Sequence, residues 1–187
     1  MKSGLMLGVN SNVIREENDF YATNPKALKQ FLEVFGEKLN EPVWECACGK
    51  GHLAEELIKH KYNVIPTDII ARGYGSASIN FLEQTDIHNG DILTNPPFKL
   101  AEEFVEKGMS LLQENKRLIL FLKIQFLEGQ KRRELFKKYP PKYVYVHSER
   151  QQCARDGEFE KYTATTQFYA WYVWEKGFSG ETIIKWI

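Results

Sequence analysis

Short apolar segments alternate with amphipathic segments along most of this chain, and this alternation is the strongest constraint on its fold. We expect strands at 42–46, 62–69, 91–94, 117–123, 142–148, 167–177 and 181–187, and helices at 25–36, 49–61, 99–114 and 128–139. Strands separated by helices form right-handed crossover units, which make the strands parallel and cover both faces of the sheet with helices. The pattern therefore predicts an α/β fold with a mostly parallel seven-stranded sheet.

The C-terminal end departs from this alternation. Only the short sequence KGFSG (176–180) separates the last two expected strands, so we predict that they form an antiparallel hairpin. The chain has no linker-like stretch, and its 187 residues fit a single domain over 1–187. Residues 1–19 are polar and unpatterned, which indicates a flexible N-terminal arm.

Composition excludes several classes of protein. With 25 basic and 25 acidic residues the net charge is zero, which disfavours nucleic-acid binding by bulk charge but allows a local basic face. No apolar run approaches the roughly 18–20 residues of a membrane span, and the N-terminus is a poor signal peptide. Three cysteines without a pairing pattern favour reduced thiols, so we expect a cytoplasmic protein with no membrane partner.

The cysteines and histidines carry no metal-site pattern. Cys46 and Cys48 are closer together than the usual C-x-x-C spacing, and no second pair accompanies them. The four histidines are scattered along the chain. We therefore expect no metal, structural thiols, and histidines that are structural or lie at the surface.

Ligands of open α/β sheets bind at the carboxyl ends of the strands. The first strand, 42–46, delivers Glu45 and Cys46 and leads into Gly49 and Gly51, which allow a tight turn and a close backbone approach to a ligand. The second strand delivers Asp68, which is suitably placed to accept hydrogen bonds from ribose hydroxyls. Each signal is weak by itself, because a plain strand-to-helix turn and a helix-capping Asp explain them equally well.

The segment TNPPF (94–98) is a far more specific signal. Asn95 offers a side-chain oxygen, and Pro96, which has no N–H, offers its carbonyl as a second acceptor. Pro97 stiffens the segment and Phe98 presents a flat apolar ring. Two fixed acceptors beside an aromatic face suit a planar amino group and the ring that bears it.

These residues carry a family resemblance. From about Asp19 to Ile187 the chain resembles S-adenosylmethionine-dependent DNA adenine-N6 methyltransferases, particularly the small phage-encoded ones. The matching segments are DFYATNP (19–25), WECACGKG (44–51), NFL (80–82), TNPPF, and the stretch from LKIQFLEGQKRRELF to WYVWEKGF. The resemblance implies a Rossmann-like class I methyltransferase fold and S-adenosylmethionine as cofactor.

The resemblance also implies roles for individual residues. The cofactor-binding residues would be Tyr21, Thr23, Pro25, Glu45, Cys46, Gly49, Gly51, Asp68, Asn80, Phe81, Leu82 and Asn95. The catalytic residues would be Asn95, Pro96, Pro97 and Phe98. Asn80 is a departure, because the family usually has Asp at this position.

The implied reaction is in-line methyl transfer to the N6 amine of an adenine flipped out of duplex DNA. Nucleic acid could contact the basic stretch 131–142, although a solvated helix face explains that stretch better. It could also contact a target-contacting loop at 148–166, which a disordered segment explains equally well. The chain has no room for a large recognition domain. We therefore expect a short or relaxed sequence preference, or help from a homodimer partner or an accessory protein.

Three alternatives share the same motif. RNA adenine, cytosine N4 and a protein glutamine amide present the same amine to the same two acceptors. A non-catalytic module that retains the cofactor site is a fourth interpretation. If the protein is phage-encoded, its location would be the cytoplasm of the host cell.

Overall fold

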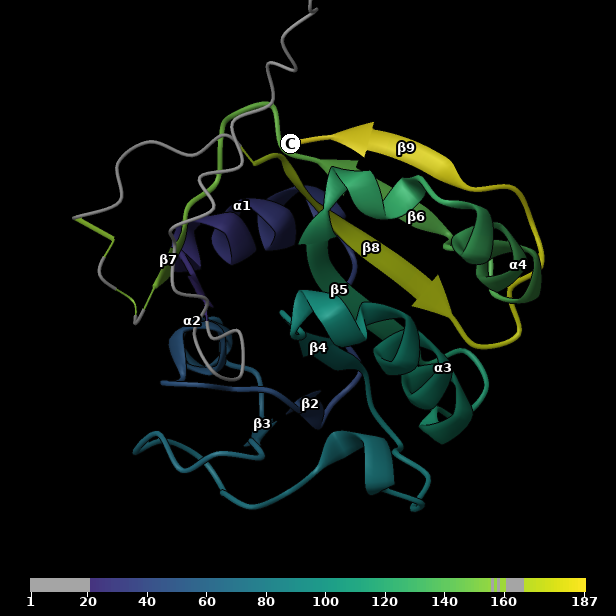
Figure 1. Ribbon diagram of the computed structural model, residues 1–187. Coiled ribbons are helices and arrows are strands. Elements are labelled where there is room, and N and C mark those ends of the chain that lie inside the picture. The colour runs from purple at the N-terminus through teal and green to yellow at the C-terminus, as the bar shows by residue number, and fades with distance from the viewer. Residues whose placement is uncertain (1–20, 156, 158, 161–166) are drawn as a thin grey trace, which may run out of the picture.

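The computed structural model describes residues 21–155, 157, 159–160 and 167–187. The predicted N-terminal arm, together with 156, 158 and 161–166 of the predicted target-contacting loop, lies outside the described residues. A twisted sheet crosses the centre of the molecule between helices (Figure 1). Among the described residues, no helix has the length and apolar character needed to cross a membrane.

Most of the predicted elements are present, with slightly shorter bounds. The strands are β1 (Tyr21–Thr23), β2 (Val43–Glu45), β3 (Val64–Pro66), β4 (Ile92–Thr94), β5 (Arg117–Lys123), β6 (Tyr143–Val146), β7 (Cys153–Arg155), β8 (Tyr169–Glu175) and β9 (Ile183–Trp186). The α-helices are α1 (Pro25–Phe35), α2 (His52–Lys59), α3 (Ala101–Leu111) and α4 (Gln130–Lys138). Short 3₁₀ turns η1 (Phe81–Glu83), η2 (Phe98–Leu100) and η3 (Ile124–Leu127) follow three of the strands.

The main sheet has seven strands in the order β3-β2-β4-β5-β8-β6-β9. The first four run parallel, and β9 runs parallel to β6. Strand β8 runs antiparallel to both of its neighbours, β5 and β6. The prediction of a mostly parallel sheet with an antiparallel C-terminal part is therefore confirmed.

The predicted C-terminal hairpin is wrong. Strand β6 lies between β8 and β9 and pairs with both of them. The reason is burial: the middle residues of β6 are buried, so β6 takes the interior place beside the buried strand β8. Strand β9 exposes three of its four residues and takes the edge of the sheet.

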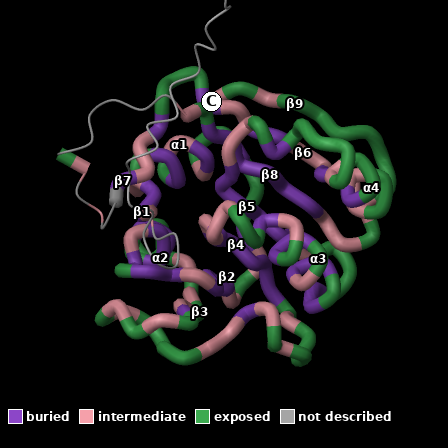
Figure 2. The backbone as a smooth tube through the Cα atoms, in the orientation of Figure 1, coloured by how far each residue is buried: buried purple, intermediate pink, exposed green. Residues whose placement is uncertain are grey.

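A two-stranded ribbon formed by β1 and β7 was not predicted. Thr23 pairs with Cys153, and Tyr21 pairs with Arg155, in antiparallel register. Figure 2 shows the two strands side by side next to the main sheet. The ribbon thus brings part of the segment 148–166 against the segment that precedes α1.

Two apolar cores cover the two faces of the sheet. Along β5, Leu118 and Leu120 belong to the core that packs against α3 and α4, whereas Ile119 and Phe121 belong to the core under α1 and α2. All four side chains are fully buried, and Figure 2 shows this burial through the middle of the sheet. The predicted placement of helices on both faces is confirmed.

A buried ion pair ties the start of β4 to the start of β5. The carboxylate of Asp91 is inaccessible to solvent and accepts hydrogen bonds from the backbone N–H of Arg117 at 2.8 Å and from its Nε at 3.0 Å. Asn40 donates its backbone N–H and its Nδ2 to the same carboxylate, both at 2.9 Å. The guanidinium also reaches Glu37 at the surface, at 2.8 Å.

We predict that Arg117→Met lowers the free energy of unfolding by about 3–5 kcal/mol, because it leaves the buried Asp91 carboxylate without a counter-charge. Urea unfolding would measure the change. Glu37→Gln is the matched control: its side chain is 50% exposed, so its loss should cost less than about 1 kcal/mol. Equal effects of the two changes would contradict the interpretation.

Candidate functional site

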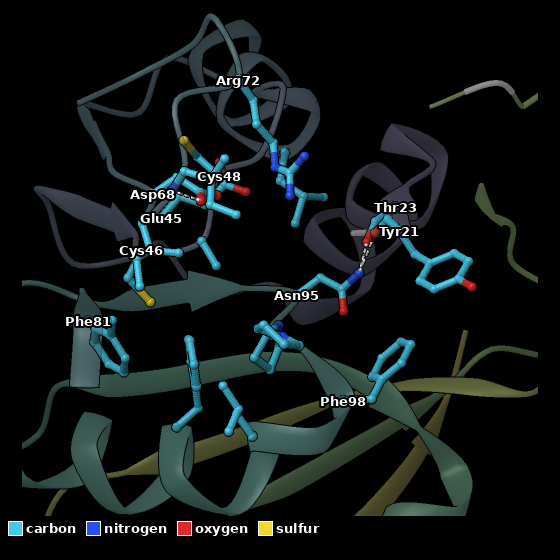
Figure 3. A pocket seen from close by; sticks show the side chains of 18 of the residues that line it. Tyr21, Thr23, Glu45, Cys46, Cys48, Asp68, Arg72, Phe81, Asn95 and Phe98 are labelled. Atoms are coloured by element: carbon cyan, nitrogen blue, oxygen red, sulfur yellow. Dashed lines mark hydrogen bonds between the residues drawn. The ribbon is translucent and has the colours of Figure 1, made fainter. Parts of the chain in front are cut away.

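A cavity of about 340 Å³ opens at the carboxyl ends of β2 and β4, beside the segment that follows β3 (Figure 3). Most of the residues predicted from the sequence line it: Tyr21, Thr23, Glu45, Cys46, Asp68, Asn80, Phe81, Leu82, Asn95, Pro96, Pro97 and Phe98. In Figure 3, Asn95 lies between two ends of the cavity, with Glu45 and Asp68 at one end and Tyr21 and Phe98 at the other.

Three predicted cofactor residues, Pro25, Gly49 and Gly51, do not line the cavity. Pro25 is the first residue of α1. Gly49 donates its backbone N–H to the Asp68 carboxylate at 2.8 Å. Gly51 precedes α2 with a φ of 85°, and a Cβ there would lie 2.5 Å from the ring of Tyr74. Only glycine fits that turn without strain.

The two carboxylates at the first end of the cavity differ in their partners. Asp68 accepts the backbone N–H of Gly49 and that of Ile70, each at 2.8 Å. Glu45 is fully buried, and its Oε2 has no hydrogen-bond partner among the described residues. Burial raises the pKa of Glu45 well above its usual value, the Ala54 backbone hydrogen bond lowers it, and the Asp68 charge raises it further. Glu45 is therefore the carboxylate that a donor or a cation would stabilise most.

The neighbouring thiols are protonated and inert. Burial is the main cause that raises the pKa of Cys46 well above its usual value and the pKa of Cys48 to about 12. Since thiolates are the nucleophiles and metal ligands, neither thiol is suited to such chemistry. Within the described part of the chain, no three or more His, Cys, Asp or Glu side chains gather closely enough to hold a metal ion.

Asn80, the departure from the family pattern, stabilises the turn η1. Its Oδ1 accepts the backbone N–H of Leu82 at 3.1 Å, and its Nδ2 donates to Glu83 Oε1 at 2.8 Å. An Asp at this position could accept the first bond but would repel Glu83. The turn places Phe81, only 2% exposed, against Trp44 with ring centroids 5.3 Å apart.

Asn95 is held in one orientation by the ribbon of β1 and β7. Its Nδ2 donates to the backbone carbonyl of Tyr21 at 3.1 Å and to Thr23 Oγ1 at 2.8 Å. Because the Tyr21 carbonyl can only accept, the amide nitrogen must face it, and the oxygen must face away. Asn95 Oδ1 is buried and has no hydrogen-bond partner among the described residues. Figure 3 shows this oxygen directed away from Tyr21 and Thr23.

An aromatic surface lies next to this acceptor. Phe98 opens η2, its ring is partly buried, and it lies 6.0 Å from the ring of Tyr169. The Nζ of Lys123 lies 4.8 Å from the centroid of the same ring. The cavity therefore offers an oriented acceptor and an aromatic ring within one enclosed space.

Arg72 and His52 are among the further lining residues to which the sequence assigned no role in the site. Arg72 extends into it from the loop after β3, in a stretch expected to be only a flexible loop (Figure 3). His52, expected to be structural or at the surface, is the first residue of α2 and also lines the cavity. The position of Arg72, four residues past Asp68 and beyond the carboxyl end of β3, was the available signal.

Comparisons with known proteins give matches in structure but not in sequence. No protein-family model and no curated protein sequence matches this chain. A Listeria monocytogenes protein assigned as a class I S-adenosylmethionine-dependent methyltransferase superposes with a TM-score of 0.60 and 14% identity, covering 87% of this chain and 64% of that chain. A Vibrio vulnificus protein assigned as a modification subunit of a type I restriction enzyme has a TM-score of 0.60 and 18% identity, covering 87% and 45%.

A third structure, a Pyrococcus horikoshii protein assigned as an RNA methyltransferase, has a TM-score of 0.54 and 12% identity, covering 81% of this chain and 82% of that chain. The chain has the class I methyltransferase fold. It spans less than two thirds of the Listeria and Vibrio chains. In this chain β2, β3 and β4 run parallel, so their carboxyl ends meet at one edge of the sheet. That edge is where Glu45, Asp68 and Asn95 gather.

We predict that Glu45→Gln stabilises the protein at neutral pH. A raised folded-state pKa means that the favourable contribution of Glu45 is present below its usual value of 4.5 and is lost as the pH rises through the folded-state pKa. The variant should therefore gain at least about 1 kcal/mol of unfolding free energy at about pH 8, and little at about pH 4. Urea unfolding across this range would measure the difference.

Asp68→Asn serves as the matched control, since it neutralises the other carboxylate of the same end. Asp68 accepts two backbone N–H groups, so this change should destabilise the fold by about 1.5–3 kcal/mol. Stabilisation by both variants, or by neither, would contradict the distinction between the two carboxylates.

Proposed function

We propose that this protein transfers the methyl group of S-adenosylmethionine to the exocyclic N6 amine of adenine in DNA. The observation that carries the proposal is the Asn95 side chain. Its nitrogen is occupied by Tyr21 and Thr23, and its buried oxygen has no partner within the described part of the chain. A buried acceptor without a partner is costly, and an N–H donor of a ligand would satisfy it.

The chemistry of an aromatic amine explains why the acceptor must be oriented. The amine of adenine is a poor nucleophile because its lone pair is delocalised into the ring. Hydrogen bonds to Asn95 Oδ1 and to the Pro96 carbonyl would favour a more tetrahedral nitrogen and stabilise the transition state more than the ground state. The rigid Pro96-Pro97 segment reduces the reorganisation required at that moment.

The residues at the end of the cavity that holds Glu45 and Asp68 fit the cofactor. S-adenosylmethionine, when bound, supplies an electrophilic methyl group on a positively charged sulfur. Glu45, with a buried oxygen that no described residue pairs with, suits a cationic or donor group of that molecule. Asp68 would accept from ribose hydroxyls with its remaining lone pairs, and Phe81 would pack against the adenine ring.

Duplex DNA could reach Asn95 only with the target base outside the helix. Flipping costs a few kcal/mol, and stacking on Phe98 would return roughly 1–3 kcal/mol. The Vibrio structure, assigned as a restriction-modification subunit, supports DNA as the substrate class, and the Pyrococcus structure keeps RNA as the main alternative. Cytosine N4 and a glutamine amide would present the same amine, and the ring face of Phe98 favours a base over an amide.

The decisive experiment is methyl transfer from radiolabelled S-adenosylmethionine to unmethylated duplex DNA, single-stranded DNA, bulk RNA and a protein extract, followed by mass analysis of digested nucleosides. We expect N6-methyladenine in DNA. Asn95→Ala should lower kcat by at least about 100-fold, a far larger change than in the affinity for the cofactor. Label in RNA or protein would retain the role of Asn95 and overturn DNA as the substrate. Cofactor binding with no transfer to any acceptor would support the non-catalytic module.

We also expect Thr23 to act as a positioning residue for Asn95. Thr23→Val removes one of the two acceptors that hold the amide, so kcat should fall by about 10–100-fold. Thr23→Ser keeps the hydroxyl and should recover most of the rate. Steady-state kinetics would separate this effect from cofactor binding, which should change far less. Equal losses in the two variants, or a loss confined to KM for the cofactor, would contradict the positioning role.

A further inference from the structure

A second hollow of about 360 Å³ lies on the other side of Phe98. Its lining residues are Phe98, Ala101, Leu122, Lys123, Gln125, Phe126, Glu128, Gly129 and Arg132. Phe98 lines both cavities, so its ring forms a shared wall. A group bound in this hollow would therefore adjoin whatever lies against Phe98 in the first cavity.

Two cations from different elements line the hollow. Lys123, the last residue of β5, places its Nζ 4.8 Å from the centroid of the Phe98 ring. Arg132, from α4, is fixed by a hydrogen bond to the Gln125 carbonyl at 3.1 Å and by Glu102 at 3.4 Å. Its side chain remains 28% exposed, and Glu128 is the acidic residue of the lining. The lining residues themselves carry one more cation than anion, and Glu102, which pairs with Arg132, lies outside the lining.

The first turn of α4 has an unusual charge pattern. Lys131, Arg132 and Arg133 follow Gln130, no acidic residue lies in this turn, and Gly129 provides no side-chain cap. Cations are unfavourable at the positive end of a helix dipole, whereas an anion is favourable there. The sequence places its cations where they destabilise the isolated helix but would attract an anion to the hollow.

We propose that this hollow binds a backbone phosphodiester of the DNA strand, next to the nucleotide whose base lies against Phe98. This inference rests on the proposed function. It gives Arg132, within the basic stretch 131–142, a role in substrate binding. Arg132 would contact the phosphate with its planar guanidinium, and Lys123 would neutralise it as a point charge. A protein glutamine substrate would bring no such anion, so the hollow favours a polynucleotide over a polypeptide.

The test measures duplex DNA binding by Lys123→Gln, Arg132→Gln and Lys137→Gln over a range of salt concentrations. Each of the first two should weaken binding by about 10-fold at low salt and reduce the slope of log K against log[salt] by about 0.9. Lys137→Gln removes one charge from the same helix at a position outside the hollow, with a side chain 55% exposed, and should leave both quantities unchanged. Cofactor binding should stay the same in all three.

Glu128→Gln provides a test that structural damage would not mimic. Removing the acidic residue of the hollow should tighten DNA binding by several-fold, because it removes a repulsion against the phosphate. Arg132→Lys, which keeps the charge, should retain most of the salt slope.

The outcomes separate this inference from the proposed function. Wild-type protein that methylates DNA while Lys123→Gln and Arg132→Gln bind it normally would overturn the phosphate site alone. An equal loss in Lys137→Gln would do the same, since it would point to the general charge of α4. Wild-type protein that binds no DNA would overturn both proposals, and the same pattern obtained with RNA would transfer the phosphate site to that polymer.

Discussion

The buried contact between Asp91 and Arg117 determines where the site can form. The Asp91 carboxylate is inaccessible to solvent and binds both the backbone and the side chain of Arg117, so the starts of β4 and β5 are held together. Only three residues of β4 separate this pair from Asn95. With its starting point fixed and its side chains fully buried, β4 can deliver the rigid TNPPF segment to one place at the sheet edge.

The main cavity holds two buried polar atoms, one at the Glu45 end and one near its middle, that have no hydrogen-bond partner among the described residues. Glu45 Oε2 and Asn95 Oδ1 are buried acceptors that lack hydrogen bonds among the residues described. A buried acceptor without a partner lowers the stability of the folded protein, and Asn95 is held in one orientation by its bonds to Tyr21 and Thr23. Such preorganisation is what a binding or catalytic site requires, since the protein need not rearrange when a ligand supplies the missing donor.

The sequence was most informative where a segment is governed by its own residues. The apolar run 117–123 predicted β5 with its bounds, because every second side chain faces one of two apolar cores. The helix predicted at 25–36 begins as expected, because Asn24 caps α1 and Pro25 supplies a fixed φ in its first turn. Most of the predicted site residues line one cavity because parallel strands bring their carboxyl ends to the same edge.

By itself, then, the sequence determined the α/β class, the order of most elements along the chain and the chemical character of the segment 94–98. Only the tertiary structure decided which strands are neighbours: β6 lies between β8 and β9 because its middle residues are buried, whereas the exposed strand β9 fits the sheet edge. It also decided that β7 pairs with β1, which orients Asn95, and that Arg72 and the hollow behind Phe98 adjoin the site. These features depend on contacts between residues far apart in the chain, and local periodicity carries no record of such contacts.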